Sequence, residues 1–153
     1  MSMHVVLFEP EIPPNTGSVA RLCAATLTPL HLVEPLGFKI DDKHLKRAGL
    51  DYWEFVDLHV HKSWNDFIET ATPKQLWYFS KGATKSYTAT RYDHDDFLIF
   101  GRETRGLPQE ILEANSDRAL RIPMMGSGVR SLNLSNAVSI VLYEALRQLG
   151  KLE

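Results

Sequence analysis

The sequence predicts an α/β fold in which a parallel β-sheet is covered by helices on both faces. Six short apolar runs recur along the chain, and segments compatible with helices lie between most of them. These runs are apolar at nearly every position, which is typical of parallel strands buried on both sides. The chain has 153 residues and shows no repeat or linker, so we expect a single domain over residues 1–153.

The expected strands are residues 5–8, 30–33, 56–60, 76–79, 97–100 and 120–122. The expected helices are residues 16–26, 42–48, 64–71, 108–114 and 134–149. Asn15 is the expected N-cap of the first helix, and Asp41 or Asp42 that of the second, which Gly49 then ends. Gly150 is expected to end the last helix.

The last helical segment is apolar on more than one side. One stripe follows spacings of three and four residues and consists of Leu134, Val138, Val141, Leu142, Ala145 and Leu149. Ala137, Ile140 and Leu146 lie on its remaining faces. A helix of this kind needs cover beyond its own sheet. We expect a homodimer to provide it; a central position within one subunit is the alternative.

The composition excludes several classes of protein. With 44% hydrophobic and 24% charged residues, no run reaches the length of a membrane span, and the apolar start is too short for a signal peptide. We therefore expect a cytoplasmic protein. Cys23 is the only cysteine, which excludes an intrachain disulfide, and it is expected to be buried. The histidines, including His59 and His61, form no recognisable ligand pattern, so no metal is expected. The net charge of −2 leaves room for a local RNA-binding patch.

Three distant segments combine glycine or small polar residues with a charged or amide side chain. They are Asn15-Thr16-Gly17-Ser18 with Arg21, Phe100-Gly101-Arg102-Glu103 with Gly106, and Ile122-Pro123-Met124 with residues 131–137. Each lies at the boundary of an expected element. Because ligands bind at the carboxyl edge of open parallel sheets, the three segments are expected to form one catalytic pocket.

A dinucleotide site is poorly supported, although Glu34 follows the second strand as an acidic ribose ligand would. Such a site needs a glycine-rich first turn, but residues 9–17 contain three prolines and one glycine. No Walker-type Gly-Lys-Ser is present either. Glu34 is therefore interpreted as a surface residue at the end of its strand.

The charged and amide residues of the three segments have a functional and a structural interpretation. Arg21 stands near a helix N-terminus and suits a phosphate or a developing oxyanion, but it could be a solvated surface residue. Glu103 is a candidate to orient Arg21 or Arg102, with an ordinary surface ion pair as the alternative. Ser131 and Asn133 belong to a cluster that lines a pocket or, alternatively, serves redundant helix capping.

Taken together, the three segments resemble the motifs of the SPOUT superfamily of knotted RNA methyltransferases, along essentially the whole chain. The patterns are Asn-x-Gly-x-x-x-Arg at residues 15–21, Phe-Gly-x-Glu-x-x-Gly at 100–106, and Ile-Pro-Met followed by Ser-Leu-Asn-Leu-Ser-Asn-Ala within 122–137. The minimal length and the segments 9–17 and 47–52 are similar to the group that methylates the wobble ribose of tRNA.

The resemblance implies transfer of a methyl group from S-adenosylmethionine to the 2′-hydroxyl of the tRNA wobble nucleotide (position 34, cytidine or modified uridine). It also implies a homodimer, no metal, and a deep trefoil knot in the C-terminal half, which is rare among folds. The implied cofactor-binding residues are Tyr78, Phe79, Ser80, Gly101, Ile122, Ser131 and Leu132. The implied catalytic residues are Arg21, Asn15, Glu103, Ser131 and Asn133.

Three questions about this interpretation stay open. Arg21 would accept the hydroxyl proton, or instead act as an electrostatic clamp, because a guanidinium stays protonated in water. The candidate RNA contacts are Arg21, Lys43, Lys46, Arg47, Arg130 and Tyr143. A solvated charged face is the alternative for the basic residues. The alternative functions are methylation of another RNA position and a noncatalytic RNA-binding module.

Overall fold

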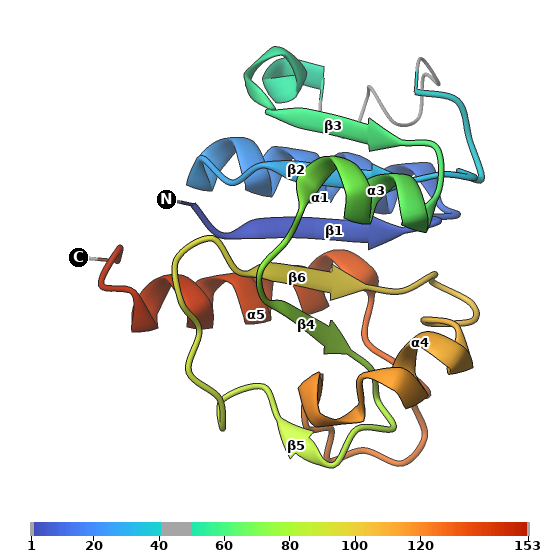
Figure 1. The fold of residues 1–153 in the computed structure, drawn as a ribbon, viewed down its shortest axis with the longest axis vertical. Helices are drawn as coiled ribbons and strands as arrows, with labels where there is room; N and C mark the ends of the chain where they lie inside the picture. Colours follow the sequence, from blue (N-terminus) through green and yellow to red (C-terminus); the bar gives the residue numbers. More distant parts are fainter. Residues whose placement is uncertain (1, 41–49, 153) are drawn as a thin grey trace.

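The computed structural model describes residues 2–40 and 50–152 and contains a seven-stranded sheet in the order β3-β2-β1-β6-β4-β7-β5 (Figure 1). Every pair of neighbouring strands is parallel, as predicted. The strands are β1 (His4–Phe8), β2 (Leu30–Val33), β3 (Leu58–His61), β4 (Leu76–Phe79), β5 (Lys85–Ser86), β6 (Phe97–Phe100) and β7 (Ala119–Arg121).

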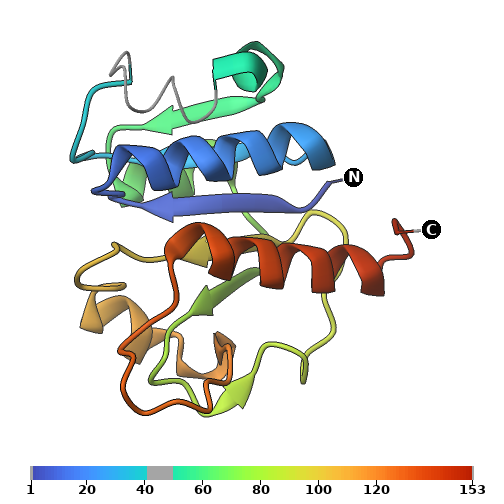
Figure 2. The same ribbon diagram turned by 180° about the vertical axis from the view of Figure 1, so that it is seen from behind.

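Helices cover both faces of the sheet, which confirms the predicted three layers. The α-helices are α1 (Pro13–Thr26), α3 (Trp64–Ala71), α4 (Gln109–Ala114) and α5 (Leu134–Gln148). Two 3₁₀-helices are η1 (Leu50–Phe55) and η2 (Ser116–Arg118). Helices α1 and α5 lie side by side on one face, whereas α3 and α4 lie on the other (Figures 1 and 2). None of the described helices has the length and apolar character needed to cross a membrane.

The two hydrophobic cores follow from this layering. The core under α1 and α5 contains Cys23, which is buried as predicted, and burial raises the pKa of its thiol to about 12. The opposite core is built around Phe67 of α3 and the β-strand residues that face it. Strands β2 and β6 are buried at every position, as expected for parallel strands covered on two sides.

The prediction that Asn15 caps the first helix is wrong. Helix α1 begins at Pro13 with Ile12 at the N-cap, whose side chain makes no capping hydrogen bond. Proline suits the first helical position because its fixed φ is already helical and its missing N–H would have no partner there. The Asn15 side chain is therefore free for other contacts. The expected helix at 42–48, with Asp41, Asp42 and Gly49, lies outside the described residues.

Helix α5 matches the predicted helix closely. Its buried residues are Leu134, Val138, Val141, Leu142, Ala145 and Leu146. Leu146 was predicted on the outer face but is only 5% exposed, because it packs into the core of its own subunit. Ile140 and Tyr143 are the large hydrophobic side chains left on the outer face, at 36% and 43% exposure. Gly150 follows the helix with a φ of 71°, as a helix-ending glycine does.

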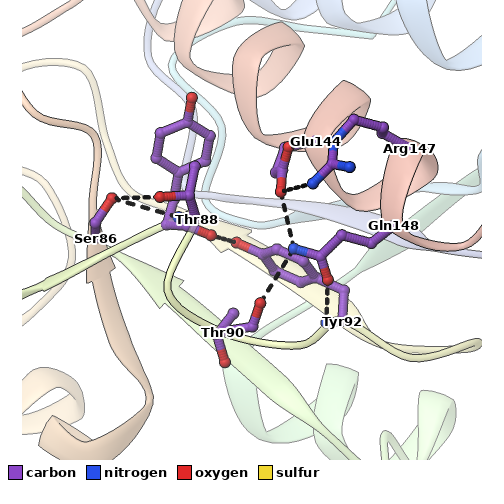
Figure 3. Close-up of polar contacts among 8 residues, drawn as sticks. Ser86, Thr88, Thr90, Tyr92, Glu144, Arg147 and Gln148 are labelled. Atoms are coloured by element: carbon purple, nitrogen blue, oxygen red, sulfur yellow. Dashed lines mark hydrogen bonds and ion pairs between the residues drawn. The ribbon is translucent and has the colours of Figure 1, made fainter.

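A polar network fastens the end of α5 to the segment that leads into β6 (Figure 3). The Gln148 side chain donates to the carbonyl of Thr90 at 3.1 Å and accepts from the amide of Tyr92 at 2.9 Å. It also donates to Glu144 at 2.8 Å, and the Tyr92 hydroxyl donates to the carbonyl of Tyr87 at 2.6 Å. These bonds hold a segment with little secondary structure in a fixed position against the helix.

Candidate active site

Three adjacent strands end together at the carboxyl edge of the sheet. Phe79 of β4 is paired with Phe100 of β6 and with Leu120 of β7, so the residues that follow them emerge side by side. The Phe79 and Phe100 rings stack at 4.8 Å between centroids. Gly101 and Ser80 come next, and the amide of Ser80 donates to the carbonyl of Leu120 at 2.9 Å. This edge is where an α/β sheet binds its ligand.

Glu103, in the loop after β6, binds the start of helix α1. Its carboxylate accepts hydrogen bonds from the amide of Glu11 at 2.8 Å and from the amide of Ile12 at 3.0 Å. The Asn15 side chain donates to the same carboxylate at 3.3 Å. The carboxylate is favoured there because the amides of Glu11 and Ile12 precede the first helical residue and have no partner within the helix. The first two sequence segments are thus joined directly.

Within one subunit, Glu103 orients neither Arg21 nor Arg102. Its two oxygens accept from the N–H groups of the two residues that precede α1. Arg102 instead lies 3.8 Å from the carboxylate of Glu9 and donates through Nε to the carbonyl of Gly106 at 2.9 Å.

A second carboxylate makes the reciprocal contact between the same two loops. Glu11 accepts hydrogen bonds from the Thr104 amide at 2.9 Å and from the Thr104 hydroxyl at 2.8 Å. The Thr104 backbone hydrogen bond is the main cause that lowers the pKa of the Glu11 carboxyl, and Arg105 at 3.7 Å adds to it. This contact was not predicted from the sequence. The available signal was an acidic residue in a proline-rich turn just before a helix.

Asn133 brings the third segment to the other two. Its side-chain nitrogen donates to the Asn15 side-chain oxygen at 3.2 Å. Its own oxygen accepts from the Ser135 amide at 2.9 Å and therefore caps α5. Asn133 combines the capping role with a link to the site. Glu103, Asn15 and Asn133 form a continuous chain of hydrogen bonds, which we call the motif cluster.

The glycines of the second segment allow its loop to close on itself. A Cβ at Gly101 would lie 2.3 Å from the carbonyl carbon of Gly106 and 2.4 Å from the nitrogen of Leu107. Gly106 has a φ of 66°, and its backbone exchanges hydrogen bonds with Arg102 at 2.9 and 3.2 Å. Only glycine permits this close approach, which sets the path of the loop that presents Glu103.

Arg21 lies elsewhere in the subunit. It is six residues beyond Asn15 on α1, which places it about 9 Å further along the helix axis and on another face. Its guanidinium lies over the ring of Tyr52 in η1, at 4.6 Å from the centroid, and its NH2 lies 3.4 Å from the Tyr52 hydroxyl. A hollow of about 480 Å³ beside it is lined by Arg21, Ala24, Ala25, Leu27, Tyr52 and Phe55. A single subunit does not bring Arg21 to the motif cluster.

The other predicted site residues fall into three groups. Lys43, Lys46 and Arg47 lie outside the described residues. Arg130 and Ser131 are exposed, and Leu132 and Ile122 half-buried, in and beside the loop that joins β7 to α5. Tyr143 is exposed on α5. The Tyr78 side chain is buried in the core on the α3 side, so the edge itself is formed by its neighbours Phe79 and Ser80.

Residues 2–143 match the model of the SpoU rRNA Methylase family. The chain belongs to this family. The resemblance to SPOUT methyltransferases is thereby confirmed. A "Putative tRNA (cytidine(34)-2'-O)-methyltransferase" of Geobacillus stearothermophilus is 56% identical over 97% of this chain and 96% of its own length. The "tRNA (cytidine(34)-2'-O)-methyltransferase" of Escherichia coli K12 is 51% identical over 97% of this chain and 94% of its own.

Solved structures of SpoU proteins share the fold. One, described as "Structural insights into the 2-OH methylation of C/U34 on tRNA", superposes with a TM-score of 0.92 at 49% identity, over 97% of each chain. The AdoMet-bound rRNA methyltransferase of Sinorhizobium meliloti superposes with a TM-score of 0.85 at 27% identity, over 97% of this chain and 57% of its own. SpoU methyltransferases use S-adenosylmethionine as their cofactor.

The histidines form a cluster that is separate from the SpoU motifs. His31 of β2 lies between His4 and His61, with ring nitrogens 3.0 and 2.9 Å apart, and the His59 ring stacks on it. Desolvation by burial, with smaller contributions from the neighbouring histidines, lowers the pKa of His31 to about 3. Across the described part of the chain, no group of three or more His, Cys, Asp or Glu side chains is arranged to hold a metal ion.

Proposed function

We propose that this protein methylates the ribose 2′-hydroxyl of the tRNA wobble nucleotide, cytidine or modified uridine at position 34, and that it works in the cytoplasm, where this tRNA is found. The observation that carries the proposal is the similarity, at 51% and 56% identity over almost the full length, to relatives named for methylation at cytidine 34. The motif cluster supports it, because three distant segments of the family pattern meet at one edge of the sheet.

The edge formed by β4, β6 and β7 suits S-adenosylmethionine. Bound there, the cofactor supplies a methyl group activated by the positive charge on sulfur. Backbone groups of Phe79, Ser80, Gly101, Ile122, Ser131 and Leu132, with Tyr78 behind them, would hold it. The fit rests on the shared end of three adjacent strands and on the absence of a side chain at Gly101, which lets the loop after β6 fold back tightly.

A deep trefoil knot is part of the proposal. After β7, near one edge of the sheet, the chain returns so that α5 packs beside α1 and against the central strand β6 (Figure 2). The returning segment carries Ser131 and Asn133 to the proposed cofactor edge. A path that crosses back over β4 in this way is consistent with threading through the loops at that edge.

The proposed site is completed by a second copy of the chain. Arg21 and the motif cluster face different directions in one subunit, so a homodimer is needed to bring Arg21 of the partner subunit over the cofactor edge. Exposed apolar side chains on the α1 and α5 side support this arrangement: Leu27 at 84%, Tyr143 at 43% and Ile140 at 36% exposure. Burying such side chains between subunits is favourable.

Arg21 then acts on the reacting oxygen as a fixed cation. Because a guanidinium stays protonated, it stabilises the developing alkoxide or clamps the adjacent phosphate, and the proton of the 2′-hydroxyl passes to solvent water. The motif cluster fixes the loops that position the two reactants, and positioning alone lowers the barrier by several kcal/mol. Exposed basic residues, with Arg130 among those described, and Tyr143 are the proposed contacts to the anticodon arm.

Total tRNA incubated with isotopically labelled cofactor tests the function. The labelled nucleotide is identified by mass spectrometry, and the expected product is 2′-O-methylated nucleotide 34. Arg21→Lys keeps the charge but loses the planar fork, and we expect it to abolish most turnover. Arg91→Lys, an exposed arginine in the segment before β6, is the matched control. Label on another position supports a different RNA target, and absence of cofactor binding in calorimetry supports a noncatalytic module.

A further inference from the structure

We propose that Tyr52 is a positioning residue that sets the orientation of the Arg21 guanidinium for methyl transfer. The inference rests on the proposed role of Arg21 and adds a residue to which the sequence motifs give no function. Two contacts come from the same ring: the guanidinium lies over its face at 4.6 Å, and the hydroxyl lies 3.4 Å from NH2. Face and edge contacts together fix both the plane of the guanidinium and its rotation within that plane.

Tyr52 is held firmly enough to serve this purpose. It belongs to η1, which packs against α1. The adjacent Trp53 and the following Val56 pack against the core under α1 and α5, and the Val56 amide donates to the Trp53 carbonyl at 3.2 Å. The backbone that follows Tyr52 is therefore anchored in the same core as the helix that carries Arg21.

The contact leaves Arg21 available for a ligand. Stacking uses the flat face of the guanidinium, and the tyrosine hydroxyl engages one of its five N–H donors. The arginine and the tyrosine are both exposed, so a phosphate or ribose oxygen has access to the remaining donors. A long arginine side chain otherwise samples many rotamers, and confining it before the substrate arrives lowers the entropy lost in the transition state.

The test uses Tyr52→Phe, which keeps the ring, and Tyr52→Leu, which removes it. If an exposed cation–π contact is needed in the transition state, its loss lowers the rate by a factor of roughly two to five, and by more where water is excluded. We expect kcat to fall about threefold in Tyr52→Phe and about tenfold in Tyr52→Leu. The KM for tRNA, the Kd for the cofactor and the unfolding temperature should stay near wild-type values. Glu54→Gln, at an exposed position of η1 that does not line the hollow beside Arg21, should retain wild-type kcat.

A double-mutant cycle separates positioning from a structural role. If Tyr52 acts through Arg21, Tyr52→Leu lowers the residual rate of Arg21→Lys by less than twofold, because the planar group it holds is already gone. The same tenfold loss in both backgrounds would overturn the proposal, as would wild-type kcat in Tyr52→Leu or a loss confined to stability. Failure of the proposed function is distinguishable, because the wild-type protein would then leave nucleotide 34 unmethylated.

Discussion

The buried histidine cluster makes the stability of the fold depend on pH. The pKa of His31 is lowered to about 3, and those of His4 and His61 are also lowered, with desolvation as the main cause in each case. The unfolded chain, with an ordinary pKa of 6.5, binds more protons below that pH than the folded chain does. The contribution of the neutral histidines to the free energy of unfolding is therefore fully present above pH 6.5. It is lost progressively as the pH falls towards 3.

The size of the effect follows from the shift of His31 alone. A pH of 5 is about 1.5 units below the pKa of His31 in the unfolded chain and still above its pKa in the folded chain. Each unit corresponds to about 1.4 kcal/mol, so the folded state loses about 2 kcal/mol between pH 7.5 and pH 5. His4 and His61 add to this loss with the same sign.

Replacement of the central ring tests this reasoning. His31→Phe keeps an aromatic side chain among the rings of His61, Phe67 and Phe97 but cannot titrate. Urea unfolding at pH 7.5 and pH 5 should show a pH-dependent loss that is about 2 kcal/mol smaller in the variant, whatever its absolute stability. His94→Asn, at an exposed position, should behave as the wild type does. An unchanged pH dependence in His31→Phe would refute the assignment.

Three further substitutions probe the motif cluster, the glycine loop after β6 and the polar network at the end of α5. Glu103→Gln turns one of the two oxygens that accept from the Glu11 and Ile12 amides into a donor. Calorimetry should show a free energy of unfolding about 2 kcal/mol lower, and turnover should also be lower. Gly101→Ala places a methyl group against backbone and should weaken cofactor binding and lower Tm, whereas Gly82→Ala, with its nearest neighbour at 3.9 Å, should not. Gln148→Leu removes the hydrogen bonds in Figure 3 that join Gln148 to the segment before β6. Urea unfolding should show a free energy of unfolding lower by about 1 to 3 kcal/mol.

The sequence predicted most of the sheet, because strands buried on both faces are apolar throughout. Strands β2, β4 and β6 have the predicted bounds. Strand β5 was missed because it consists of two residues, Lys85 and Ser86, which carry no apolar signal. The third strand begins at Leu58 instead of residue 56, because Val56 packs into the core directly after η1.

The meeting of the three segments at the sheet edge was predictable, but their contacts were not. Glycine and amide residues next to apolar runs marked the sheet edge correctly. The partners of Glu103 are backbone amides, which every residue except proline carries, so no side-chain pattern reveals them. The sequence contains two features typical of a helix start near α1, an asparagine and a pair of prolines. The structure shows that the helix begins at the prolines. The Tyr52 ring under Arg21 belongs to the connection between β2 and β3, and hydrophobic periodicity does not predict the path of such a connection.

The strand order has a consequence during synthesis on the ribosome. Strand β1 lies between β2 and β6, but β6 begins at Phe97, long after β1 and β2 have emerged. At elongation rates of about 5–20 residues per second, one edge of β1 stays unpaired in the nascent chain for several seconds. Unpaired edges of this kind recruit other chains. Chaperone occupancy and codon usage across the middle of the message should therefore influence how much of this protein escapes aggregation.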